Sequence, residues 1–186
     1  RLLDIGLEVK SDTRIGRDIP FDKLKKDHDA VFIAIGAQGS ALLDIDGIDT
    51  EGVVYGMDYL VEAKKGEKPA NLGKKVVVIG GGNVAIDCAR TALRFGSDVS
   101  IAYRRAREQM PAFDWEIEEA EEEGVKFHFL ASPNRIVAGS GKVAGIECVR
   151  MELGEPDASG RRRPVAVLGS EFVMDADTVI LAIGQK

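Results

Sequence analysis

A glycine-rich turn that follows a short apolar run most constrains what this chain can fold into. After Lys75, the run Val76–Ile79 is an unbroken series of β-branched side chains, which is typical of a parallel strand buried on both faces. The turn Gly80-Gly81-Gly82-Asn83-Val84-Ala85 then matches G-x-G-x-x-G/A and opens a helix predicted over Asn83–Phe95. A strand, this turn and a helix in that order indicate a Rossmann-like dinucleotide-binding unit.

Each position in the turn has its own expected role. Gly80 permits the tight turn out of the strand, and Gly82 lets a pyrophosphate approach the backbone closely. Ala85 is small enough for the helix to pack on the sheet. The first N–H groups of the helix and its positive dipole end then face the phosphates. We therefore predict that Gly80–Ala85, including Gly81, Asn83 and Val84, binds the cofactor. The alternative is a glycine-rich turn without a ligand.

The end of the next predicted strand, Asp98–Tyr103, discriminates between cofactors. An NAD site carries Asp or Glu about 20 residues after the motif, where it binds the ribose hydroxyls. This chain has Tyr103-Arg104-Arg105-Ala106-Arg107 there. A guanidinium pairs with a 2′-phosphate that a carboxylate would repel. We predict that Tyr103, Arg104, Arg105 and Arg107 bind NADP, the alternative being a solvated basic turn.

The rest of the pattern extends the parallel sheet and adds antiparallel strands. We expect an α/β fold, a parallel sheet with an antiparallel β hairpin or meander. Downstream we predict a helix at Ala112–Glu123, a strand at Val125–Leu130, a hairpin from 135–138 and 143–153, a polar loop at Glu155–Pro164, and strands at Ser170–Met174 and Thr178–Ile183. Upstream we predict a strand at Leu7–Lys10, a helix at Phe21–His28, a buried strand at Asp29–Gly36, a connector at 37–54 and a helix at Val54–Lys65.

Composition excludes several classes of function. The net charge of −6 argues against a general nucleic-acid or anionic-membrane binder. No apolar stretch approaches the roughly 20 residues of a membrane helix. The two cysteines, Cys88 and Cys148, cannot form a disulfide framework or a self-contained iron–sulfur or zinc site, and we expect reduced thiols of a cytoplasmic protein. His28 and His128 have no evident catalytic partner, so we predict neither a catalytic nor a metal-ligating residue.

Taken together, these motifs resemble the NADPH-binding domain of the small (beta) subunit of NADPH-dependent glutamate synthase. The resemblance also covers NADP-binding parts of ferredoxin–NADP transhydrogenases and of dihydropyrimidine dehydrogenase. It is carried by Val76–Arg90, by Tyr103-Arg104-Arg105 followed by Met110-Pro111-Ala112, by Glu152–Asp157 with Gly160-Arg161-Arg162, and by Asp177–Gln185. Cys88 is not part of a C-x-x-C motif, which excludes a disulfide reductase of the thioredoxin reductase type.

The resemblance implies a flavoprotein with two dinucleotide-binding domains, in which the NADPH domain interrupts the FAD domain. Residues 1–45 would be a remnant of the FAD domain and a connector, and 46–186 the NAD(P)H domain. Gly36, Ile183 and Gly184 would then lie where the chain passes between the domains, close to the cofactors. The remainder of the flavin domain is expected outside these residues, and this piece alone is expected to be inactive and without bound FAD.

The resemblance also implies a route for electrons in the intact protein. Hydride would pass from NADPH to flavin N5, and electrons would continue to iron–sulfur clusters elsewhere in the protein or in a partner. A large subunit or a ferredoxin-type acceptor is the implied partner, and a homodimer is possible. Two alternatives stay open, a non-catalytic dinucleotide-binding or sensor module and the NADP-binding part of a transhydrogenase.

Overall fold

The computed structural model describes residues 6–37, 39–156, 160 and 162–184. The chain divides into two compact units, Arg1–Gly36 and Ala37–Lys186. The assignment of residues 1–45 to a remnant of the FAD domain and a connector remains a prediction. Three residues of the motifs quoted above, Asp157, Arg161 and Gln185, lie outside the described residues.

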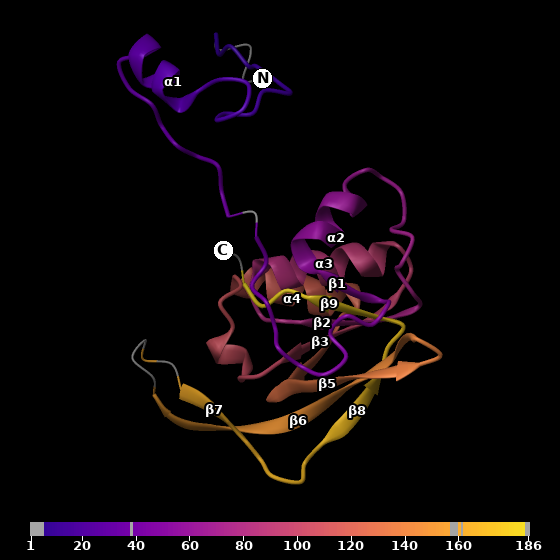
Figure 1. Cartoon of the computed structure of the whole chain (residues 1–186). Helices are drawn as coiled ribbons and strands as arrows, with labels where there is room; N and C mark the ends of the chain where they lie inside the picture. The colour runs from indigo at the N-terminus through magenta and orange to yellow at the C-terminus, as the bar shows by residue number, and fades with distance from the viewer. Residues whose placement is uncertain (1–5, 38, 157–159, 161, 185–186) are drawn as a thin grey trace. The chain divides into compact units, whose positions relative to one another are not determined.

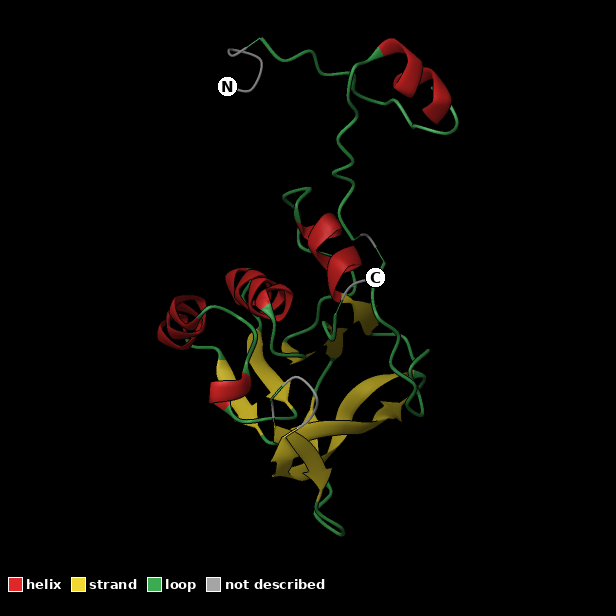
Figure 2. Cartoon of the chain, turned by 90° about the vertical axis from the view of Figure 1, so that its left-hand side faces the viewer, coloured by secondary structure: helices red, strands yellow, loops and turns green. Residues whose placement is uncertain are grey.

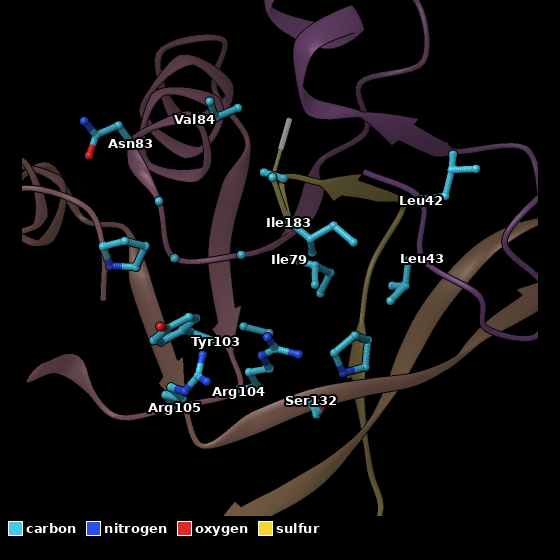
Figure 3. Close-up of a pocket in the computed structure, with 18 residues that line it drawn as sticks. Leu42, Leu43, Ile79, Asn83, Val84, Tyr103, Arg104, Arg105, Ser132 and Ile183 are labelled. Atoms are coloured by element: carbon cyan, nitrogen blue, oxygen red, sulfur yellow. The ribbon is translucent and has the colours of Figure 1, made fainter. Parts of the chain in front are cut away.

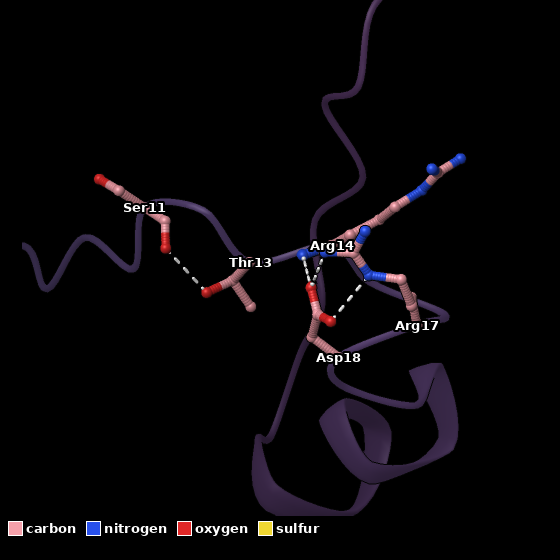
Figure 4. A network of polar contacts seen from close by, with 5 residues as sticks. All are labelled: Ser11, Thr13, Arg14, Arg17 and Asp18. Carbon is pink, nitrogen blue, oxygen red and sulfur yellow. Dashed lines mark hydrogen bonds and ion pairs between the residues drawn. The ribbon is translucent and has the colours of Figure 1, made fainter.

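In the described part of the first unit, a tight turn precedes one short helix, α1 (Phe21–Asp27). In that turn the Asp18 carboxylate accepts hydrogen bonds from the Arg14 N–H and from Arg17 Nε, each at 2.8 Å (Figure 4). The Arg17 guanidinium is the main cause of the lowered pKa of Asp18. Thr13 Oγ1 donates to the Ser11 carbonyl at 2.9 Å, so the turn is held by local polar contacts rather than by a core.

The predicted buried strand at Asp29–Gly36 is wrong for this structure. The segment forms no strand, and Phe32, Ile33 and Ile35 are 92%, 62% and 78% exposed. The strand predicted at Leu7–Lys10 is also absent. An apolar run becomes a buried strand only beside partner strands and a covering layer, and no described strand of this unit supplies either.

The second unit is a three-layer structure around a parallel sheet (Figures 1 and 2). The sheet order is β1-β9-β2-β3-β4, and every neighbouring pair is parallel. One face carries the helices and the other an antiparallel sheet, each with its own apolar cluster. The parallel strands are β1 (Val53–Tyr55), β2 (Lys75–Ile79), β3 (Asp98–Tyr103), β4 (Lys126–Phe129) and β9 (Thr178–Leu181), and the helices are α2 (Gly56–Ala63), α3 (Asn83–Arg94) and α4 (Asp114–Glu123).

The antiparallel layer is built around the long strand β6. It pairs with β5, β7 and β8, each in antiparallel register. The bounds are β5 (Ala131–Gly139), β6 (Lys142–Pro156), β7 (Arg162–Ala166) and β8 (Phe172–Asp175). This layer confirms the predicted antiparallel addition to a Rossmann-like sheet.

Three local predictions differ from the structure. Val53–Tyr55 form strand β1 where the connector and helix were expected, and the helix runs from Gly56 to Ala63. A three-residue strand is too short to show a periodicity of its own. The polar loop predicted at Glu155–Pro164 is replaced in part by the ends of β6 and β7, whose side chains are mostly exposed and so show no apolar alternation.

The sheet order places a topological switch point beside β2. The chain passes from β2 through α3 to β3 on one side, whereas β9 returns to the other side of β2. Open α/β sheets bind ligands in the crevice outside the carboxyl ends of strands at such a point. The glycine turn after Ile79 and the segment after Leu181 both lie there, because Ile79 and Leu181 are register partners.

Candidate functional site

A pocket of about 660 Å³ opens at the carboxyl ends of β2, β3 and β9 (Figure 3). It brings together residues predicted from three distant parts of the sequence. Of the predicted site residues, the pocket wall contains Gly80, Gly81, Gly82, Asn83, Val84, Tyr103, Arg104, Arg105, Ile183 and Gly184. Ala85 is not in the wall, since it lies in the first turn of α3 and is fully buried in the core.

The three glycines of the turn lack side chains for different reasons. A Cβ on Gly80, which has φ of +143°, would overlap the Ala182 carbonyl oxygen. A Cβ on Gly81 would lie 2.5 Å from the Tyr103 ring. A Cβ on Gly82 would point into open space, with Pro111 Cγ nearest at 3.8 Å. Gly80 and Gly81 are therefore needed for packing, and Gly82 keeps the pocket accessible to a ligand.

The backbone amides of the turn and of the first residues of α3 belong to the pocket wall. Gly82 is the N-cap of α3, and no side chain caps the helix. The Asn83 Oδ1 instead accepts a hydrogen bond from the Phe113 N–H at 3.2 Å. Among the described residues, none accepts a hydrogen bond from the amides of Gly81 to Val84. Free N–H groups at a helix N-terminus form an anion-binding site.

The basic end of the pocket contains two of the three predicted arginines. Arg104 is exposed and lines the pocket. Arg105 also lines it but is only 6% exposed, and its Nε donates to the Arg162 carbonyl at 3.0 Å. Arg107 lies outside the wall, where it forms ion pairs with Glu121 at 3.0 Å and Glu118 at 3.8 Å. Arg104 is thus the guanidinium best placed to meet an anionic ligand.

Tyr103 supports the glycine turn from below. Its ring contacts Gly81, and its hydroxyl donates to the Gln109 carbonyl at 2.6 Å. The Gln109 Oε1 accepts from the Ala106 N–H at 3.2 Å. The Ala112 N–H then donates to the Gly81 carbonyl at 3.2 Å. These bonds fold the segment after β3 back against the turn, which fixes where Arg104 projects.

The opposite end of the pocket is apolar. Ile79, Leu43 and Ile183 lie there, together with Leu42, which is 73% exposed (Figure 3). The Ala41 N–H donates to the Gly184 carbonyl at 2.9 Å and holds the two segments together. A ligand with an anionic end and a flat, less polar end matches a pocket with this polarity.

Some wall residues were missed by sequence reasoning, and Gly36 falls outside the wall. Ser132 and Pro133 enter from β5, after Leu130 turns the chain with φ of +55°. No motif marks this turn, and residues 37–54 were expected to be only a connector. The wall residues that were not predicted are Leu42, Leu43, Ile79, Ala102, Pro111, Ser132, Pro133 and Ala182. Gly36 belongs to the other unit, and its role stays a prediction.

Comparisons with known proteins identify the family and several relatives. The model of the pyridine nucleotide-disulphide oxidoreductase family matches residues 8–186. The chain is 53% identical to the NADPH-Fe(3+) oxidoreductase subunit beta of Geobacter sulfurreducens, over 97% of this chain and 28% of that protein. It is 44% identical to the glutamate synthase [NADPH] small chain of Escherichia coli, over 97% of this chain and 41% of that protein. The chain therefore spans well under half of these relatives.

A solved structure shares the fold. FprA of Mycobacterium tuberculosis, determined in complex with NADPH, aligns with a TM-score of 0.76 at 24% identity. The alignment covers 93% of this chain and 54% of FprA. At this identity the likeness concerns the fold alone, and it confirms the predicted fold class. Among the described residues, no helix is long and apolar enough to cross a bilayer.

Proposed function

This chain belongs to the pyridine nucleotide-disulphide oxidoreductase family, and we propose that its second unit is the NADPH-binding domain of a flavin-dependent oxidoreductase. The observation that carries the proposal is the pocket itself, in which a glycine turn with free amides and the exposed Arg104 face the same space. The two contacts suit a pyrophosphate and a 2′-phosphate respectively. The names of the relatives from Geobacter sulfurreducens and Escherichia coli, which include NADPH, support the same choice.

The residues present fit such a ligand in size as well as in charge. The missing side chain of Gly82 leaves the approach to the α3 N-terminus open. The volume of about 660 Å³ lies within the roughly 300–1,000 Å³ of small-molecule sites. The apolar end around Ile79 and Ile183 is the part of the pocket suited to the nicotinamide ring.

In the intact protein, the chemistry would be hydride transfer from NADPH to FAD, with electrons passed on to iron–sulfur clusters or a partner subunit. The role of this domain would be to bind NADPH and to orient it. The α3 N-terminus and Arg104 would fix the phosphates, and the apolar end would hold the nicotinamide. No acid or base is required of the chain, because the cofactors carry the reaction. The proposal includes an electron acceptor, which is a large subunit or a ferredoxin-type protein. It also includes a homodimer.

Calorimetric titration of wild-type protein and of Arg104→Ala with NADP⁺ and NAD⁺ tests the cofactor assignment. Loss of a charged hydrogen bond should weaken NADP⁺ binding by about 1.5–3 kcal/mol and leave NAD⁺ binding unchanged. Arg107→Ala is the matched control, because Arg107 is paired with Glu118 and Glu121 outside the pocket. Equal losses for both cofactors in Arg104→Ala would contradict the proposal.

An experiment on the full-length protein distinguishes an oxidoreductase from a binding or sensor module. Anaerobic addition of NADPH should bleach the flavin absorbance of the purified full-length protein. Binding of NADPH without any bleaching would support the module instead.

A further inference from the structure

Arg105 is the one charged side chain that is buried among the described residues. A buried guanidinium is costly unless it is hydrogen-bonded. Its Nε donates to the carbonyl of Arg162, the first residue of β7, at 3.0 Å. The wall of the pocket is therefore fastened to the β6–β7 hairpin through this side chain.

Arg162 is also the residue that closes the hairpin. Its guanidinium donates to the carbonyls of Leu153 and Gly154 on β6. The β6–β7 register shifts between Leu153 and Pro156, where regular ladder bonds are interrupted. The Arg162 side chain spans this irregularity, while its own carbonyl receives Arg105.

The backbone of Arg105 provides a second connection to β6. Its carbonyl accepts a hydrogen bond from the Leu130 N–H at 3.1 Å, and the Leu130 carbonyl accepts from the Met151 N–H at 2.8 Å. Leu130 adopts φ of +55°, a conformation that is uncommon for leucine. Arg105 thus joins the end of β3 to both strands of the hairpin.

We propose that Arg105 is a positioning residue that couples the β6–β7 hairpin to the basic end of the pocket. Arg104 is exposed at the pocket, and Arg105 holds the wall beside it. An anion at this end attracts the Arg105 guanidinium and favours its ordered position, which holds Arg162 in turn. Because coupling is reciprocal, loosening the hairpin must also weaken binding of the ligand. The ligand part of this inference rests on the proposed function, whereas the contact with the hairpin does not.

Hydrogen exchange measured by mass spectrometry on peptides covering 162–167 tests the contact. Arg105→Met should speed exchange there about tenfold, as expected from the loss of a charged hydrogen bond. Arg104→Met removes the same chemical group next door and should leave that exchange unchanged. Adenosine 2′,5′-bisphosphate, the probe ligand, should slow exchange at 162–167 in the wild type and not in Arg105→Met.

A second variant tests the coupling from the hairpin side. Arg162 is not part of the pocket wall, yet Arg162→Ala should weaken binding of the bisphosphate about fivefold, at the lower end of usual coupling. A merely structural role for Arg105 would leave this affinity unchanged. If Arg105→Met does not fold, Arg162→Ala still decides the question.

Two results would overturn the coupling. One is unaltered exchange at 162–167 in folded Arg105→Met, and the other is unaltered affinity in Arg162→Ala whose hairpin exchanges faster. If the wild-type protein does not bind the bisphosphate, the proposed function fails, but exchange in ligand-free Arg105→Met still tests the contact.

Discussion

At the scale of single residues, the three adjacent glycines separate packing from ligand access. The sequence predicts the tight turn at Gly80 and the open approach at Gly82 from the motif alone. It does not predict the role of Gly81, since that depends on the ring of Tyr103, a residue on the next strand. A motif describes local conformation, and contacts made across the sheet lie outside it.

We predict opposite outcomes for two neighbouring substitutions. Gly81→Ala places a Cβ 2.5 Å from the Tyr103 ring, so it should destabilise the fold by about 1–3 kcal/mol through overpacking. Gly82→Ala meets nothing closer than 3.8 Å and should leave stability unchanged while it abolishes dinucleotide binding. Urea unfolding measures the first effect and calorimetric titration the second.

The control is built into this pair, because both substitutions add the same methyl group to the same turn. Strong NADP⁺ binding by Gly82→Ala would show that no phosphate approaches this glycine. Wild-type stability of Gly81→Ala would show that Tyr103 moves away without cost.

At the scale of elements, ion pairs fasten α3 to α4. Glu123 accepts from Arg90 at 2.5 Å and from Arg94 at 2.9 Å, and the side chain is 30% exposed. Arg90 also pairs with Glu119 at 2.8 Å. Hydrogen bonding from Arg90 is the main cause that lowers the pKa of Glu123 to about 2. Part of the acidic run along α4 therefore forms ion pairs with α3 and with Arg107. From composition alone, this run would be only a solvated helix face.

The lowered pKa of Glu123 predicts a pH-dependent contribution to stability. Because its pKa in the folded state lies below the ordinary value of 4.5, the stabilisation is fully present above that pH and is lost as the pH falls toward about 2. Glu123→Gln should therefore cost up to about 1 kcal/mol at pH 7, and the difference from wild type should shrink from pH 4.5 downward.

Urea unfolding at pH 7, 4.5 and 3 measures this difference. Glu122→Gln is the matched control, since Glu122 is exposed and forms no ion pair among the described residues. A constant difference between Glu123→Gln and wild type at all three pH values would contradict the prediction.

At the scale of the whole molecule, the parallel sheet follows from the sequence far better than the structure of residues 7–36 does. Val76–Ile79 and Val179–Leu181 are unbroken apolar runs, and they form buried strands because helices cover one face of the sheet and the antiparallel strands cover the other. Asp29–Gly36 has the same pattern, yet it is exposed in this structure. Whether this segment forms a buried strand depends on neighbouring strands, which its own sequence does not specify.

The pocket residues divide in the same way, into those that local motifs predict and those that depend on the sheet order. Its glycine turn and Arg104 are readable from local motifs. The contributions of Leu42, Leu43, Ser132 and Pro133 arise because the sheet order brings distant segments to one switch point. Arg105 shows most clearly what local motifs miss. Its place in the run of arginines predicts a phosphate contact, whereas in the structure its Nε donates to the Arg162 carbonyl.

We propose that the pocket at this switch point is an NADPH site. A crystal structure of the protein with NADP⁺ tests it most directly. We predict the pyrophosphate on the amides of Gly81 to Val84, the 2′-phosphate on Arg104 and the nicotinamide beside Ile183. NADP⁺ bound elsewhere, or with its 2′-phosphate away from Arg104, would contradict this assignment of the pocket.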